Sequence, residues 1–237
     1  KVLVDLDPGL HRTGIAPGEP VLALAKQIHA DDNLTLRGLQ CYAGQVMHIE
    51  EFGERREQSL KAMKVLGETR DAFKAAGLPC DILSGGGTGS FDIDPEAHVL
   101  TELQGGSYIF MDKQYNDVKA PNGGDAPFET SLFVQMSVVS NNTPKLATTD
   151  AGFKAFSTDA EPPVLLGGAP EGAKYFFFGD EQGGVLLPPD VKLPLGATLT
   201  AITPHCDPTV NLYDAYHVVR GDTLVAIWPI EARGKSA

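Results

Sequence analysis

The chain has 237 residues, of which 42% are hydrophobic and 21% charged, so it can bury a sizeable core and fits neither the disordered nor the fibrous class of protein. Its formal net charge of −12 repels phosphate backbones and anionic lipid, which argues against nucleic acid and membrane surfaces as partners and favours small molecules. No apolar run approaches the roughly 18–20 residues of a membrane span, no secretory signal opens the chain, and three cysteines without a CxxC pair indicate reduced thiols and a cytoplasmic protein.

The first half of the chain alternates between strand and helix patterns. Strands are expected at Val2–Leu6, Leu34–Tyr42, Cys80–Ser84 and Ser107–Met111. Helices are expected at Pro20–Ala30 and Glu50–Ala76, and the charged residues of the second are expected to form a solvated face. This alternation predicts a parallel α/β sheet or barrel. Because a closed barrel of eight units needs about 250 residues, the residues before 112 correspond to roughly half of one.

After residue 112 the pattern changes to strands separated by Gly, Pro and Asp turns. The strand-like runs are Ser131–Val139, Tyr175–Phe178, Thr198–Thr203 and Thr223–Trp228. The sequence therefore predicts two domains, with an α/β domain over residues 1–111 and an all-β domain over residues 112–237. The chain also opens on Lys1 directly before a strand pattern, without an initiator Met, and is expected to begin inside the barrel.

A glycine-rich loop, Ser84–Ser90, follows the third strand and is the strongest local signal. Backbone N–H groups without neighbouring Cβ atoms can approach an anion closely, and the hydroxyls of Ser84, Thr88 and Ser90 add donors, so the loop can hold a phosphate. It lacks the Lys of a Walker A motif and the spacing of a dinucleotide fingerprint. Since glycine runs are also common in turns, a plain turn fits the loop equally well.

A second signal is the segment His205-Cys206-Asp207-Pro208. In an extended segment, residues two apart point the same way, so His205 and Asp207 could present an imidazole and a carboxylate to one cation while Cys206 faces the opposite side. Water, substrate oxygens or a distant side chain would complete such a site. Taken alone, the segment fits a turn better, with Asp207 bonding its own backbone ahead of Pro208.

His48 and Arg12 each follow a predicted strand, in the place where α/β barrels carry their chemistry. Arg12 could meet a carboxylate or phenolate oxygen of a ligand. The alternatives are a packed or surface histidine and a surface ion pair. Cys41 and Cys80 lie in apolar strands and are expected in the core.

Taken together, these segments resemble the D-threonine aldolase and D-serine dehydratase group, which are pyridoxal-phosphate enzymes of the alanine racemase fold. The matching segments are Val4–Asp7 with Arg12–Ile15, Gly38–Gly44 with His48, Ser84–Gly89, Glu102–Gln104 with Gly106–Tyr108, Asp150–Lys154, and His205–Asn211. Several motifs in the same order are far more specific than any one of them, and they favour both the phosphate and the metal interpretation.

The resemblance implies a (β/α)8 barrel of the alanine racemase type, with only its C-terminal half in this chain, followed by the β domain. It implies that the pyridoxal phosphate is held by the loop residues Ser84, Gly86, Gly87, Thr88 and Gly89 together with Tyr108. It also implies that Arg12 and Tyr42 lie beside the cofactor ring, with His48 as the catalytic base. Aldolases of this group carry His-x-Asp where the dehydratases carry His-x-Cys, so His205 and Asp207 imply an aldolase with Mn²⁺ or Mg²⁺.

The activity implied is retro-aldol cleavage of a D-3-hydroxy amino acid, such as D-threonine, to glycine and an aldehyde. The alternatives are a dehydratase acting on D-serine or a 3-hydroxyaspartate, and a non-catalytic fragment that binds the cofactor. Two departures from the group stand out. The Schiff-base lysine belongs to a motif upstream of Lys1, in the missing N-terminal half of the barrel, and Gln182 stands where the group often has the histidine of Glu-His-Gly. A homodimer is expected from the resemblance alone.

Overall fold

The computed structural model describes residues 1–235, which separate into two units. The first unit joins Lys1–Tyr108 to Asp117–Pro127, and the second joins Ile109–Asn116 to the chain from Phe128 onward. Within the described residues, no helix is both long and apolar enough to cross a membrane.

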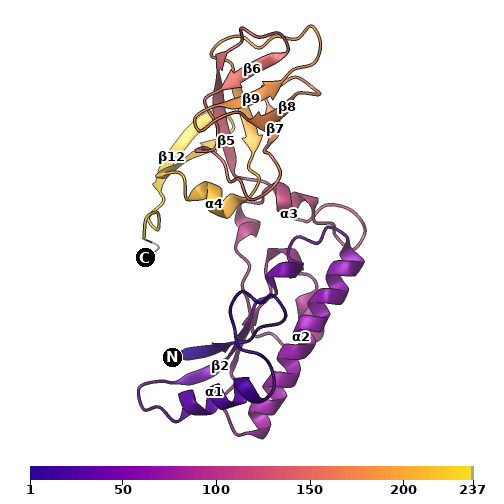
Figure 1. The fold of residues 1–237 in the computed structure, drawn as a ribbon, viewed down its shortest axis with the longest axis vertical. Helices are drawn as coiled ribbons and strands as arrows, with labels where there is room; N and C mark the ends of the chain where they lie inside the picture. Colours follow the sequence, from indigo (N-terminus) through magenta and orange to yellow (C-terminus); the bar gives the residue numbers. More distant parts are fainter. Residues whose placement is uncertain (236–237) are drawn as a thin grey trace. The chain divides into compact units, whose positions relative to one another are not determined.

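The first unit is a four-stranded parallel sheet with helices (Figure 1). Its elements are β1 (Val2–Asp5), α1 (Glu19–His29), β2 (Leu36–Cys41), α2 (Phe52–Ala75), β3 (Ile82–Gly85) and β4 (Glu102–Leu103), with short 3-10 turns η1 (Gly44–Val46), η2 (Thr88–Ser90), η3 (Asp94–Ala97) and η4 (Ser107–Ile109). The strand order is β1-β2-β3-β4, and all three pairings are parallel. The carboxyl ends of these strands therefore meet at one edge of the sheet.

The long helix α2 begins and ends where its sequence predicts. The carboxylate of Glu51 accepts hydrogen bonds from the backbone N–H groups of Gly53 and Glu54, at 2.9 and 2.6 Å, which caps the helix start. At the other end, Gly77 has φ +68°, a backbone conformation that glycine adopts without strain. Buried apolar residues of α2, including Met63 and Leu66, pack into the core with the sheet.

The predicted solvated face of α2 is wrong at one position, because Arg55 is only 1% exposed. Its guanidinium donates to the carbonyls of Ile49 and Glu50, at 2.7 and 3.1 Å, and to the carbonyl of Lys119. These backbone acceptors are partners for the two terminal nitrogens of the buried guanidinium, whereas its Nε has no hydrogen-bond partner among the described residues. They also attach residues 117–127 to the first unit.

The strand predicted at Ser107–Met111 is wrong. The fourth strand is β4, where the carboxylate of Glu102 accepts a hydrogen bond from the Ser84 hydroxyl at 2.6 Å, and the amide of Gln104 donates to the same hydroxyl at 2.9 Å. These bonds fix the pairing of β3 with β4 ahead of residue 107. The chain then forms η4, so that the N–H of Tyr108 reaches Thr88.

The second unit is dominated by antiparallel strands. Its strands are β5 (Phe133–Ser140), β6 (Leu146–Thr149), β7 (Val164–Gly167), β8 (Lys174–Phe177), β9 (Gly183–Leu186), β10 (Thr198–Ile202), β11 (Ala215–Arg220) and β12 (Thr223–Pro229), and its helices are α3 (Lys113–Asp117) and α4 (Cys206–Val210). Six strands form a sheet in the order β7-β10-β5-β6-β9-β8, and β11 pairs with β12 as a hairpin. In β5 every second residue is buried, and Val134, Met136 and Val138 point into the core. The sequence did not predict β6, β7, β9 or β11.

The described residues include Cys41, Cys80 and Cys206, and they form no disulfide among themselves. Cys41 and Cys206 are buried, and burial raises the pKa of Cys41 to about 12. Cys80 is half-buried, and burial raises its pKa too. Because thiolates react and thiols do not, we expect Ellman's reagent to label no more than Cys80, slowly, in the native chain, and all cysteines after denaturation. Fast labelling of a second thiol without denaturant would contradict this burial.

Candidate active site

The glycine-rich loop lies at the carboxyl edge of the parallel sheet, directly after β3. Its glycines are required by the protein's own packing. A Cβ on Gly89 would lie 2.0 Å from the carbonyl oxygen of Met47, and one on Gly86 would lie 2.4 Å from the carboxylate of Asp94. Gly86 also has φ +66°. A side chain at Gly89 would push the loop away from the turn that follows β2, and one at Gly86 would push it away from Asp94 in η3.

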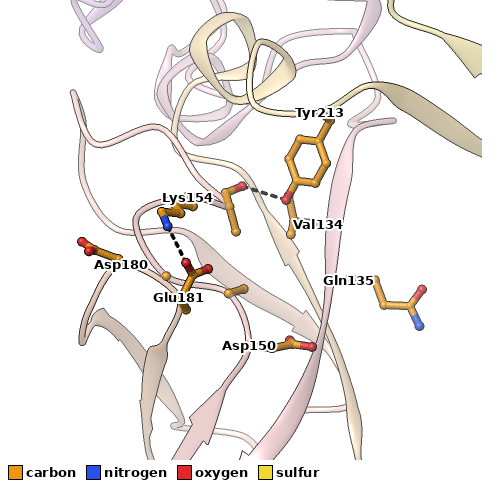
Figure 2. Close-up of a pocket in the computed structure, with 10 residues that line it drawn as sticks. Val134, Gln135, Asp150, Lys154, Asp180, Glu181 and Tyr213 are labelled. Carbon is orange, nitrogen blue, oxygen red and sulfur yellow. Dashed lines mark hydrogen bonds and ion pairs between the residues drawn. The ribbon is translucent and has the colours of Figure 1, made fainter.

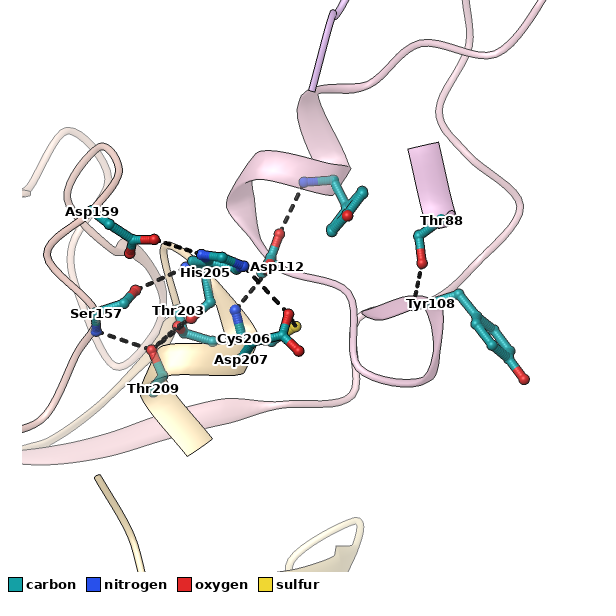
Figure 3. Close-up of polar contacts among 11 residues, drawn as sticks. Thr88, Tyr108, Asp112, Ser157, Asp159, Thr203, His205, Cys206, Asp207 and Thr209 are labelled. Atoms are coloured by element: carbon teal, nitrogen blue, oxygen red, sulfur yellow. Dashed lines mark hydrogen bonds and ion pairs between the residues drawn. The ribbon is translucent and has the colours of Figure 1, made fainter. Parts of the chain in front are cut away.

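The hydroxyls predicted to bind phosphate divide into two kinds. Ser90 donates to the carboxylate of Asp94 at 2.6 Å, and Ser84 donates to Glu102, so both serve the protein's own structure. Thr88 accepts a hydrogen bond from the backbone N–H of Tyr108 at 3.1 Å (Figure 3). A hydroxyl that accepts can still donate its own proton. Thr88 therefore joins two glycine-containing loops, which fits a cradle for a phosphate group.

Arg12 and Tyr42, from the segments after β1 and β2, lie together at the same edge. The guanidinium carbon of Arg12 lies 5.2 Å from the centroid of the Tyr42 ring. The ring also borders the glycine-rich loop, because a Cβ on Gly87 would lie 3.5 Å from it. The structure thus brings three of the predicted contacts of the cofactor into one place.

His48 is exposed in the turn after η1. The preceding residue, Met47, is buried, and its carbonyl oxygen and sulfur face the missing Cβ atoms of Gly89 and Gly87. The turn that carries His48 is therefore packed against the glycine-rich loop. Parallel strand order explains this proximity of residues about 40 positions apart in sequence.

In the second unit, His205 and Asp207 lie together, with His205 Nε2 3.3 Å from Asp207 Oδ2. The extended segment expected here is wrong, because α4 begins at Cys206 and His205 is the residue that caps it. Cys206 does not face the opposite side either, since its Sγ lies 3.5 Å from Asp207 Oδ2. Pro208 is compatible with the helix because the N–H groups of a first helical turn have no partner within the helix.

Buried polar side chains hold the backbone around His205 (Figure 3). Ser157 Oγ accepts from the N–H of His205 at 3.0 Å, and the hydroxyl of Thr209 donates to its carbonyl at 2.8 Å. Asp112, fully buried, accepts from the N–H of Cys206 at 2.7 Å. Sequence reasoning did not find Ser157 or Asp112, since they lie 48 and 94 residues from their partners and carry no local signal.

The ring of His205 lies between two carboxylates. Its Nδ1 lies 2.7 Å from Asp159 Oδ2, and Asp207 is on the Nε2 side. Hydrogen bonding to Asp207, followed by Asp159, raises the pKa of His205 to about 9. Asp159, whose side chain is half exposed, is also absent from the residues that the sequence singled out.

The donor atoms of His205 and Asp207 suit a divalent ion. Two ligands at about 2.1 Å from one ion lie roughly 3.0–3.4 Å apart at octahedral or tetrahedral angles, and the observed separation is 3.3 Å. Among the residues that the structure describes, no group of three or more His, Cys, Asp and Glu side chains could hold a metal ion. This pair would therefore need oxygens from water or substrate, as open catalytic sites do.

A separate polar cavity of about 280 Å³ lies in the second unit (Figure 2). Its lining includes Asp150 and Lys154, and Lys154 forms an ion pair with Glu181. Asp150 and Lys154 are the two ends of one segment that carries the family resemblance. Gly152 between them has a packing role, because a Cβ there would lie 2.2 Å from the carbonyl oxygen of Gly179.

Two family models match the chain. The alanine racemase N-terminal domain matches residues 1–114, and the putative serine dehydratase domain matches residues 131–219.

Known relatives match nearly the whole chain. It is 40% identical over 238 residues to a D-threonine aldolase from an Arthrobacter species, covering 99% of this chain and 61% of that protein. It is 37% identical over 237 residues to a 3-hydroxy-D-aspartate aldolase from Paracoccus denitrificans, covering 99% of this chain and 60% of that protein. Among solved structures, a D-threonine aldolase from Filomicrobium marinum matches with a TM-score of 0.93 and 36% identity, over 99% of this chain and 64% of that one. The chain thus spans less than two thirds of the length of each.

Proposed function

We propose that the chain belongs to the alanine racemase-fold group that contains the D-threonine and 3-hydroxy-D-aspartate aldolases, and that it acts in the retro-aldol cleavage of D-3-hydroxy amino acids, such as D-threonine to glycine and acetaldehyde. The observation that carries this proposal is the pairing of the His205 imidazole with the Asp207 carboxylate at 3.3 Å. This is the ligand pair that the resemblance implies for an aldolase.

The architecture proposed is the C-terminal half of a pyridoxal-phosphate-binding barrel over residues 1–111, followed by a β domain over residues 112–237. The parallel order of β1 to β4 and the antiparallel sheet that contains β5 to β10 support it. The two units differ from these bounds in two places, since residues 109–111 group with the second unit and residues 117–127 with the first. A homodimer and a cytoplasmic location complete the proposal.

Pyridoxal phosphate, when bound, withdraws electrons from the carbon next to the bond that breaks. Residues of this chain would hold and orient it. Thr88 and the backbone of Gly86–Gly89 would bind the phosphate with the loop at Tyr108. Arg12 and Tyr42, which lie together beside that loop, would position the ring.

The other half of the chemistry is proton transfer from the substrate's β-hydroxyl. His205 and Asp207 would hold a divalent ion, Mn²⁺ or Mg²⁺, whose positive charge makes that hydroxyl more acidic. His48 would accept the proton as general base. Its exposed position in a turn, beside the glycine-rich loop, leaves its ring accessible to a substrate.

The second candidate is a dehydratase that eliminates water from D-serine or a 3-hydroxyaspartate. Two observations favour it: the match to the serine dehydratase domain model over residues 131–219, and the Cys206 thiol 3.5 Å from the Asp207 carboxylate. A thiolate ligand in place of the carboxylate would suit a softer ion such as zinc.

Product analysis with metal removal separates the two. We expect the holoenzyme to convert D-threonine to equal amounts of glycine and acetaldehyde, to lose this activity on dialysis against EDTA, and to regain it with Mn²⁺. L-Threonine serves as the control substrate. Ammonia and a keto acid as the products would instead identify a dehydratase.

A further inference from the structure

We propose that Asp159 is a positioning residue that sets the tautomer of His205 and so prepares its Nε2 for a divalent ion. This inference rests on the metal site proposed above and concerns a residue outside it. Asp159 is 46 residues from His205 in sequence and lies in the loop after the Asp150–Lys154 segment.

Asp159 faces one particular nitrogen of the His205 ring. Asp159 Oδ2 lies 2.7 Å from His205 Nδ1, within hydrogen-bond distance. An ionised carboxylate only accepts hydrogen bonds, so the ring nitrogen that faces it must carry the proton. In the neutral ring this leaves the lone pair on Nε2.

The other ring nitrogen of His205, Nε2, faces a second carboxylate. Its neighbour is Asp207 Oδ2 at 3.3 Å. These two atoms need a positive charge between them, which in the absence of a metal is a second ring proton, since hydrogen bonding to Asp207 raises the pKa of His205. A divalent ion can supply that charge in place of the proton. Its affinity for the site then depends on whether the Nε2 lone pair is held pointing toward Asp207.

One loop holds both the ring and the backbone of His205 (Figure 3). Ser157 accepts from the backbone N–H at 3.0 Å, and Asp159, two residues on, accepts from the ring. Because Ser157 is buried and bonded in turn to Thr209, the loop is fixed independently of Asp159. Replacing Asp159 should therefore free the ring and leave the backbone in place. Carboxylates behind metal-binding histidines act in this way in metalloenzymes.

The test is Mn²⁺ affinity, measured on the protein by titration calorimetry or from the EPR signal of free Mn²⁺. We expect Asp159→Asn, which keeps the shape but loses the charge, to weaken Mn²⁺ binding by about 10- to 100-fold. Asp159→Glu should recover most of the affinity. The matched control is Glu161→Gln, which removes the same charge two residues away at an exposed position and should bind like the wild type.

A spectroscopic readout separates positioning from a purely structural role. In ¹⁵N-labelled protein saturated with diamagnetic Zn²⁺, the ring of His205 should show a protonated Nδ1 in the wild type and in Asp159→Glu, and a changed pattern in Asp159→Asn, whose amide can also donate. Circular dichroism should show that all variants keep the fold.

The outcomes are distinct. The role of Asp159 is overturned if Asp159→Asn binds Mn²⁺ like the wild type or shows an unchanged ring pattern. If His205→Ala binds Mn²⁺ more weakly in the same experiment, the metal site itself is kept. Equal Mn²⁺ binding by the wild type and His205→Ala overturns the site itself, and with it this inference.

Discussion

His205→Ala and Asp207→Ala should each lower kcat/KM for D-threonine cleavage by about a thousandfold, because a catalytic cation contributes several kcal/mol and each 1.36 kcal/mol is a factor of ten in rate. Both variants remove one of the two donors that lie 3.3 Å apart. Added Mn²⁺ should not restore the rate, since a single side chain leaves too few protein ligands. The measurement is steady-state kinetics over a range of Mn²⁺ concentrations.

His217→Ala is the matched control for the loss of an imidazole, because His217 is exposed on β11 in the same unit. It should retain the wild-type rate. Asp207→Ala is expected to keep the fold, because the Asp207 side chain is two-thirds exposed. Near-normal turnover by either site variant would remove the metal pair from the mechanism.

The parallel half of the fold could be predicted well because its elements have strong local signals. The strand at residues 2–5, the capped helix α2 and the strand before the glycine-rich loop all appear within two residues of their predicted limits. The exception is the strand predicted at Ser107–Met111, which is wrong. The true fourth strand is held by the hydrogen bond between Ser84 and Glu102, which apolar periodicity does not reveal.

The antiparallel half was less predictable because several strands are short and weakly patterned. In β9, Gly183 and Gly184 are tightly packed: a Cβ on Gly184 would lie 2.2 Å from the ring of Phe176. Glycine normally disfavours a strand, so the packing that requires it here was not visible in the sequence. The strands β6 and β7 have four residues each, too few for a clear alternation.

The same distinction applies to the candidate site. Arg12, the glycine-rich loop and His48 were identifiable because each follows a strand, and parallel order brings strand ends together. Tyr42 was indicated only by the family resemblance. The sequence singled out His205 and Asp207 on the expectation of an extended segment. That expectation is wrong, because the helix α4 begins at Cys206, between them. Asp112, Ser157 and Asp159 could not be found, because long-range hydrogen bonds from sheet loops leave no sequence spacing to recognise.

His48→Ala should lower kcat for D-threonine cleavage by about 10²- to 10⁴-fold, the usual contribution of a general base. His48 is exposed and lies in a turn whose packing depends on the buried Met47, so its removal should not disturb the glycine-rich loop. The visible absorbance of the bound cofactor should therefore stay unchanged. The residual activity of the variant should increase with pH, because hydroxide can take the place of the missing base. Kinetics and absorbance spectra on the same holoenzyme preparation measure both.

The matched control is His29→Ala, which removes an exposed imidazole at the end of α1 in the same unit. Its turnover and absorbance should equal those of the wild type. A further comparison is His48→Gln, whose amide fills a similar space without the basicity of imidazole and should be as slow as the alanine variant. If the glutamine variant were fully active, the ring would be acting only through its size, and the proton of the β-hydroxyl would have to leave to another group.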